Sequence, residues 1–185
     1  YRIFLLNIDR WRGASIENFP EKYIWVNIPS FIVQGIENDS IKKTNNAVVG
    51  TPKTQTPTLI SAIDKIVLFP EWSIPQSIIK NEMKGKSTGY LNKYKIYQNG
   101  KRITASQINW SKPVRMVQPS GYGNSLGIIK FLFPNKHSVY LHDTPSKSLF
   151  DNEVRAYSHG CVRVEKPLSL AAYILTLDGK DIAQD

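Results

Sequence analysis

The stretch SVYLHDTPSKSLFDNEVRAYSHGCVRV, residues 138–164, contains two short β-like runs with a polar segment between them. The first run alternates in character, so Tyr140 and His142 point to the same face of a strand. The second run, residues 162–164, begins directly after Cys161. The nineteen positions from His142 to Cys161 give the chain room to leave one strand, loop out and return beside it. The pattern predicts two neighbouring strands that bring these two side chains together.

Other short β-rich runs, separated by Pro, Gly and Asn, occur along the chain. They are residues 23–28, 31–36, 47–50, 63–69 and 127–133. The segment TPKTQTP, residues 51–57, cannot be a central strand because proline has no N–H to donate to a sheet ladder. Many short strands at this spacing are typical of a sandwich or barrel. We therefore predict a mainly β (α+β) fold, a β-sandwich with short flanking helices.

Helical signals occur in three places, of which the first is the start of the chain. In residues 1–11 apolar side chains recur at helical spacing, and Gly13 fits a helix stop. A helix that begins without a cap is typical of a helix cut in its middle. We interpret residues 1–13 as the end of a truncated helix or a linker. A second, short helix is predicted over residues 75–83, which begin with a proline.

The clearest helical pattern lies in residues 166–177. Pro167 suits a first helical turn, and Gly179 suits the position just past a helix end. The residues predicted to share one apolar face are Leu168, Ala171, Ala172 and Leu175. This segment is the best candidate for a helix packed on the sandwich.

Residues 84–118 differ in composition from their surroundings. They are rich in Lys, Tyr, Asn and Gly and contain no long apolar run. Asn99-Gly100, between YKIYQ and KRIT, is the strongest short hairpin signal in the chain. We interpret the stretch as an insertion or lid beside the main sheet, and the QPSGYGNSLG segment that follows it as a loop.

Length, composition and charge narrow the class of protein. The chain has 185 residues, 41% of them hydrophobic, which suits one domain with a small insertion. No run of about 18 apolar residues is present, so no transmembrane helix is expected. The 24 Lys and Arg against 15 Asp and Glu give a net charge of +9, which suits a polyanionic partner: nucleic acid, an anionic membrane or a bacterial wall. The basic residues are scattered and nucleotide-binding glycine motifs are absent, so no nucleic-acid partner is expected.

Cys161 is the single cysteine of the chain, so no internal disulfide is possible. A free thiol has a pKa of about 8.5, so a catalytic cysteine needs a base or positive neighbours. His159, Arg155 and Arg163 are all near it in sequence. Gly160 lets the backbone approach a substrate closely, and consecutive N–H groups there could face an oxyanion. The alternative is a small buried hydrophobe beside a turn glycine.

His142 favours the catalytic interpretation. It ends one predicted strand, while Cys161 precedes another. Asp143 and Thr144 offer oxygen atoms that could orient its imidazole. The alternative for His142 is a strand-end histidine with a structural role. His137 lies in a PNKH turn and is expected to be exposed to solvent.

A zinc site is the next possibility to weigh. His142, His159 and Cys161 supply three nitrogen or sulfur ligands, as a catalytic zinc needs. Their spacing lacks a close pair such as H-E-x-x-H or C-x-x-C. We therefore expect neither a metal nor a cofactor.

The motif SVYLHDTP followed by SHGCVRV resembles the signature of the L,D-transpeptidases, which carry the YkuD domain. The stretches NIDRWRG, VNIPSF, VVGTPKTQTP, FPEWSIP and LGIIKFLFPNKHSVYLHDTPSKSLF are similar to the larger, YcbB-type branch of Gram-negative bacteria, and the resemblance covers nearly the whole chain. In that branch the catalytic domain follows a peptidoglycan-binding region and carries a capping subdomain. The resemblance thus implies a catalytic domain over residues 14–185 with a capping or lid insertion at about 84–118.

The resemblance also implies a role for each matching residue. Cys161 matches the nucleophile and His142 the general acid/base, while Gly160 lies in the oxyanion region. Asp143 stands where smaller members often have Gly or Ser, which leaves the group that orients the imidazole open. Residues implied to bind substrate or shape the site are Ser158, His159, Arg163, Tyr140 and Asp143. Arg163, where many members have Asn, is implied to contact a substrate carboxylate or to scaffold the loop.

The implied chemistry is acyl transfer through a cysteine thioester. The partners are two tetrapeptide stems of peptidoglycan, a donor that loses its terminal D-alanine and an acceptor amine. The product is a cross-link between the third residues of the two stems, and carbapenems are expected inhibitors. No metal or cofactor takes part. By the same resemblance the protein is expected in the periplasm, associated with the cell wall.

Two other functions fit parts of the sequence. A papain-like wall-peptide hydrolase places its cysteine before its histidine, whereas every histidine here precedes Cys161. A wall-binding module would explain the positive charge and the four tryptophans. It would leave the SHGC motif and its spaced histidine unexplained.

Overall fold

The computed structural model describes residues 20–177 and 179. Its strands are β1 (Lys22–Asn27), β2 (Ile32–Glu37), β3 (Ser40–Gly50), β4 (Lys65–Leu68), β5 (Trp72–Ser73), β6 (Lys95–Gln98), β7 (Lys101–Ile103), β8 (Arg115–Gln118), β9 (Ile129–Leu132), β10 (Leu141–His142), β11 (Ala156–Ser158) and β12 (Val162–Val164). Its helical segments are α2 (Gln76–Ile78), a π-helical turn (Ile79–Met83), α3 (Thr88–Leu91), 3-10 turns (Ala105–Gln107 and Lys147–Asp151) and α4 (Pro167–Leu177). The described residues form mostly strands with a few short helices. The predicted mainly β (α+β) fold class is therefore confirmed. The helix predicted over residues 1–11 lies outside the described residues.

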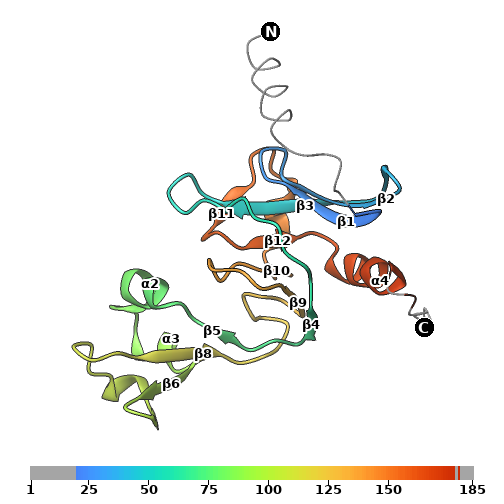
Figure 1. Ribbon diagram of the computed structural model, residues 1–185. Helices are drawn as coiled ribbons and strands as arrows, with labels where there is room; N and C mark the ends of the chain where they lie inside the picture. The colour runs from blue at the N-terminus through green and yellow to red at the C-terminus, as the bar shows by residue number, and fades with distance from the viewer. Residues whose placement is uncertain (1–19, 178, 180–185) are drawn as a thin grey trace.

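Two sheets account for the strands of the described residues (Figure 1). The larger has eight strands in the order β1-β2-β3-β12-β10-β9-β4, with β11 added beside β3. Most of its neighbours are antiparallel, but β10 and β12 are parallel, which requires the intervening chain to loop out and return. The predicted pair of neighbouring strands is therefore confirmed. The smaller sheet has four strands in the order β5-β8-β6-β7 and lies to one side of the larger one.

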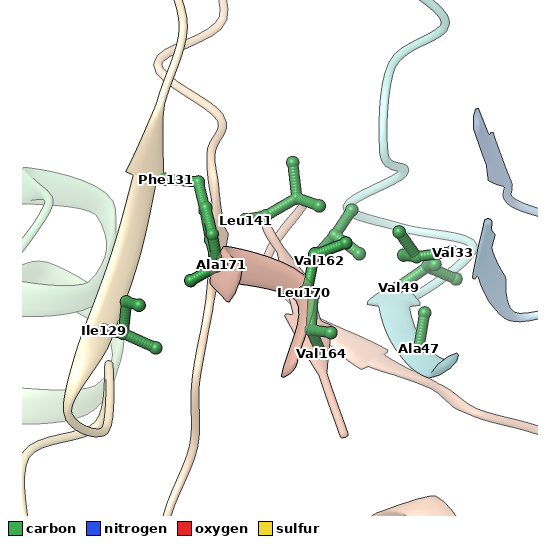
Figure 2. Close-up of a cluster of buried hydrophobic side chains, with 10 residues drawn as sticks. All are labelled: Val33, Ala47, Val49, Ile129, Phe131, Leu141, Val162, Val164, Leu170 and Ala171. Carbon is green, nitrogen blue, oxygen red and sulfur yellow. The ribbon is translucent and has the colours of Figure 1, made fainter. Parts of the chain in front are cut away.

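The main hydrophobic core lies between the large sheet and α4, and Figure 2 shows its side chains. Phe131, Leu141 and Val162 stand opposite one another on β9, β10 and β12 and are all buried. The whole buried cluster consists of Val33, Ala47, Val49, Ile129, Phe131, Leu141, Val162, Val164, Leu170 and Ala171. Side chains one position away on each of the three central strands consequently point to the opposite face.

The helix α4 is where it was predicted, and its apolar face was predicted correctly only in part: Ala171 is buried. Leu168, placed on the packed face by the sequence pattern, is 54% exposed. The buried residues of α4 are Pro167, Leu170 and Ala171. Because apolar side chains occur on most sides of this helix, the periodicity could not select the face, and docking on the sheet does.

The smaller sheet has a hydrophobic core of its own, which the composition did not predict. Its members are Ile74, Ile78, Ile79, Met83, Leu91, Ile96, Ala105, Val114 and Met116. The predicted hairpin is confirmed: β6 and β7 pair on either side of Asn99 and Gly100, with φ of 52° and 74°. The unit starts at Trp72 rather than at residue 84, since β5 and α2 belong to it. Its apolar residues are spread singly along short elements, so no apolar run marks them.

Two strand lengths differ from the prediction. β3 extends back to Ser40, through a polar stretch that pairs along β2. β10 begins only at Leu141, because the segment before it is a turn in which Ser138 has a φ of 55°. The Asn135 side chain holds this turn, accepting from the N–H of Val139 and donating to its carbonyl.

Candidate active site

A row of three polar side chains crosses the centre of the large sheet. His142 on β10 stands opposite Lys130 of β9 on one side and Arg163 of β12 on the other. This row lies on the face of the sheet opposite the buried Phe131, Leu141 and Val162. Tyr140 lies two positions before His142, and Cys161 lies two positions before Arg163, so both join this row. The segments of the two residues are held together by a hydrogen bond in which the Tyr140 carbonyl accepts from the N–H of Val162 (3.1 Å). The fold thus gathers five chemically active side chains on one face.

The Cys161 thiol is half-buried and lies against Tyr140. Both the backbone N–H and the hydroxyl of Tyr140 donate hydrogen bonds to Sγ, and the Ser138 carbonyl lies 4.0 Å from it. Burial raises the pKa of the Cys161 thiol, against the lowering effect of the Tyr140 hydrogen bonds and of the Lys130 and Arg163 charges. The resting thiol therefore keeps its proton at neutral pH, and attack on a carbonyl requires a base.

His142 has the protonation state of a base. Its ring is 5% exposed, and burial, followed by the charges of Arg163 and Lys130, lowers its pKa to about 3. Nδ1 hydrogen-bonds the backbone carbonyl of Asp143 and must carry the proton there, because a carbonyl only accepts. Nε2 is left with a lone pair. The ring contacts Tyr140 with centroids 5.5 Å apart, and among the described residues no direct bond joins it to Sγ.

The group that orients the imidazole was left open by the sequence, and it is a backbone atom. The Asp143 carboxylate faces elsewhere: it accepts from the Ile128 N–H (3.0 Å) and from Lys147 (2.5 Å). The Thr144 hydroxyl accepts from the Ser146 N–H. Asp143 therefore acts on His142 through its carbonyl, and its side chain braces the strand ends.

The turn before Cys161 is closed by Ser158. This buried hydroxyl donates to the Cys161 carbonyl (2.5 Å) and accepts from the Gly160 N–H (3.1 Å). Gly160 has a φ of 113°, in the region that favours glycine. Its N–H donates to Ser158 in this structure, and an oxyanion role for the backbone of Gly160 and Cys161 stays a prediction.

His159 and Arg155 point away from the thiol, although both are near it in sequence. His159 is half-exposed, and its Nε2 lies 2.7 Å from Oε1 of Glu82 in the π-helical turn of the smaller unit. The Arg155 guanidinium donates to the carbonyls of Ala47 (3.2 Å) and Phe31 (3.1 Å). Arg155 therefore secures β3, and the positive neighbours of Cys161 are Lys130 and Arg163 instead. His137 is exposed in its turn, as predicted.

Comparisons with known proteins identify the family. The L,D-transpeptidase catalytic domain, YkuD, matches residues 21–180. A Haemophilus influenzae protein named as an L,D-transpeptidase is 34% identical over 163 residues, which cover 82% of this chain and 33% of that protein. The chain belongs to the YkuD family of L,D-transpeptidase catalytic domains.

Among solved structures, an L,D-transpeptidase from Mycobacterium smegmatis is 15% identical with a TM-score of 0.46, covering 84% of this chain and 54% of that one. The Ldtfm–avibactam carbamoyl enzyme is 14% identical with a TM-score of 0.44, covering 81% of this chain and 44% of that one. The present chain spans about a third of the length of the Haemophilus relative.

In this YkuD domain two threonines that the sequence did not single out hold the turn before Cys161. Both lie in the TPKTQTP segment, which forms a loop as predicted. The Thr54 hydroxyl donates to the Ser158 carbonyl and the Thr56 hydroxyl to the Gly160 carbonyl, each at 2.9 Å. Their partners are backbone atoms about a hundred residues away, so no local pattern marks them.

The close approach of this loop depends on Gly50. A Cβ added there would lie 2.1 Å from the Thr54 carbonyl oxygen and 2.7 Å from the Thr56 N. We expect Gly50→Ala to displace the loop and to lower the unfolding free energy by about 1–3 kcal/mol. We also expect turnover to slow about 10- to 100-fold, because the displaced loop no longer holds Cys161 in position. Urea unfolding and steady-state kinetics measure both. Gly89→Ala, whose added Cβ would meet open space, is the control. Equal activities of the two variants would show that the Thr54 and Thr56 contacts do not hold Cys161 in position.

Residues 20–177 and 179 contain no group of three or more His, Cys, Asp or Glu side chains arranged to hold a metal ion. Over the same residues, no helix has the length and apolar character needed to cross a bilayer.

Proposed function

We propose that this domain is a peptidoglycan L,D-transpeptidase that works through a Cys161 thioester. The observation that carries the proposal is that Cys161, directly before β12, and a neutral His142 on the adjacent parallel strand β10 lie together in a YkuD domain. From the family resemblance we infer that the product is a 3→3 cross-link between stem peptides.

In the first half-reaction Sγ of Cys161 attacks the carbonyl carbon of the third residue of the donor stem, while its proton passes to Nε2 of His142. The carbon–sulfur bond forms, the amide carbon–nitrogen bond breaks, and D-alanine leaves with the proton from His142. In the second half-reaction an acceptor amine attacks the thioester and gives its proton to His142. The new amide forms, and the sulfur departs and regains that proton.

The developing oxyanion needs a donor in the same turn. Because the Gly160 N–H donates to Ser158, the Cys161 N–H is the donor that we assign to it. Tyr140 lines the same pocket, next to Sγ.

Arg163 is suited to hold the substrate carboxylate. It is half-buried in the row beside His142, and its Nε has no hydrogen-bond partner among the described residues. A buried guanidinium N–H without a partner is costly unless a ligand supplies one. This supports the carboxylate contact over the alternative role of loop scaffold.

We further assign the chain to the YcbB-type branch, with the smaller unit as its cap. Two contacts support the cap: Glu82 with His159, next to the nucleophile turn, and a hydrogen bond from Trp72 of β5 to the side chain of Tyr140. On the basis of the branch resemblance we also propose that the protein acts in the periplasm at the cell wall and that carbapenems inhibit it. A cap in this position limits the water that competes with the acceptor amine.

We expect Glu82→Gln to loosen the cap. An exposed side-chain contact of this kind contributes about 0.2–1 kcal/mol, so we expect the ratio of transfer to hydrolysis to fall by about 1.4- to fivefold. Glu71→Gln, which breaks the Glu71–Lys95 pair within the smaller unit, is the matched control. If Glu82→Gln and Glu71→Gln gave the same ratio of transfer to hydrolysis, the Glu82–His159 contact would not be what holds the cap in place.

The function itself is tested with tetrapeptide-containing muropeptides as both donor and acceptor. Mass spectrometry of the products should show a dimer whose mass is that of two monomers less one D-alanine. Tripeptide alone would indicate a hydrolase. Binding to wall fragments without any turnover would indicate a binding module and overturn the proposal.

A further inference from the structure

We propose that Lys130 is a positioning residue of the thiol: its ammonium holds the Tyr140 ring against Sγ and favours the thiolate of Cys161. The proposal rests on the proposed role of Cys161 as the nucleophile. No motif in the sequence pointed to Lys130, which lies in a predicted strand eight residues before Ser138.

The sheet register fixes the position of Lys130. It stands opposite His142 on β10 and opposite Val67 on β4, so its side chain shares the face of the active site. Its Nζ lies 4.2 Å from the centroid of the Tyr140 ring, within the range of a cation–π contact. Tyr140 in turn donates two hydrogen bonds to Sγ. Lys130 therefore packs directly on the residue that touches the nucleophile.

The charge of Lys130 has no carboxylate partner within the described residues. Asp143, which follows His142, pairs with Lys147, and Glu82 pairs with His159. A half-buried ammonium without a counterion is stabilised by a new negative charge beside it. The thiolate of Cys161 supplies that charge: it raises the pKa of Lys130, while burial, the larger effect, lowers it.

The groups that act on the Cys161 thiol are Tyr140, Lys130 and Arg163, with His142 in the same row. The two cations lower the pKa of Cys161 and also that of His142. Together they favour a thiolate beside a neutral imidazole and disfavour the imidazolium. Lys130 thus lowers the pKa of the Cys161 thiol while keeping His142 unprotonated, so that His142 can still act as the base.

The test is the pH dependence of Cys161 alkylation by iodoacetamide, followed by intact-protein mass spectrometry. In Lys130→Met we expect the midpoint to rise by about one pH unit, with roughly tenfold slower alkylation at neutral pH. Lys130→Arg keeps the charge and should stay close to the original protein. Lys65→Met, which removes an exposed lysine of β4 in the same sheet, is the control and should leave the midpoint unchanged.

Two results would overturn the proposal. One is a Lys130→Met midpoint equal to that of Lys65→Met; the other is the same shift in Lys130→Met and Lys130→Arg, since packing and not charge would then be the cause. Circular dichroism melting establishes that each variant is folded, and Lys130→Gln replaces Lys130→Met if the latter does not fold. Because alkylation needs no peptidoglycan, a failure here is distinguishable from a failure of the muropeptide assay.

Discussion

Cys161→Ala is expected to abolish cross-linking and to leave the folded structure intact. The thiol is half-buried at the site surface, and its loss removes one small group from contact with Tyr140. We expect the unfolding free energy to change by about 1 kcal/mol or less. Treatment with a carbapenem should add one equivalent of mass to the original protein and none to Cys161→Ala, because the opened ring remains on the sulfur. Intact-protein mass spectrometry and the muropeptide assay measure both effects.

A matched variant separates chemistry from packing. Cys161→Ser keeps a small polar side chain in place but offers a hydroxyl that is a much poorer nucleophile, so it should be as inactive as Cys161→Ala. Cross-linked product from either variant, or a carbapenem adduct on another residue, would remove Cys161 from the mechanism. An unmodified mass from folded original protein would count against the nucleophile and against the carbapenem proposal.

His142→Gln is expected to lower turnover by about 10²- to 10⁴-fold, the usual contribution of a positioned base. Glutamine can still donate to the Asp143 carbonyl, so the variant removes the Nε2 lone pair with little loss of the local hydrogen bond. His137→Ala, in an exposed turn, is the control and should turn over at the original rate. Equal rates for the two variants would refute the assignment of the base.

The same residue sets a dependence of stability on pH. Burial holds the pKa of His142 near 3, below its ordinary value of 6.5, so the unfolded chain binds this proton more readily than the folded one. The unfolding free energy should be unaffected by His142 above pH 6.5 and should fall as the pH decreases from there toward 3. Chemical unfolding at a series of pH values should show this loss in the original protein and a flatter profile in His142→Gln.

The sequence by itself determined the parts of this protein that depend on short-range patterns. The two β-like runs around residues 138–164 predicted that β10 and β12 are neighbours, because the residues between them leave room for the chain to loop out and return; that the pair is parallel came from the structure. Asn99-Gly100 predicted its hairpin, since these residues tolerate positive φ. The Cys161 and His142 assignments came from residue type and spacing together.

Tertiary structure decided what depends on contacts between distant segments. The apolar face of α4 and the start of the smaller unit at Trp72 follow from docking, which periodicity and composition do not encode. The carbonyl that orients His142 belongs to the backbone, which every residue type carries. The residue type at position 143 therefore could not reveal that this carbonyl orients His142.

The surroundings of the nucleophile were the least predictable feature. Thr54 reaches the nucleophile turn from a loop 104 residues away, and Lys130 reaches Tyr140 through the register of β9 against β10. A shift of that register by one residue would turn Lys130 toward the core. Sequence spacing shows which residues can share a strand face, but only the pairing of strands shows which faces meet. A catalytic role for Cys161 could therefore be proposed from the sequence, whereas the charges around it could not be predicted.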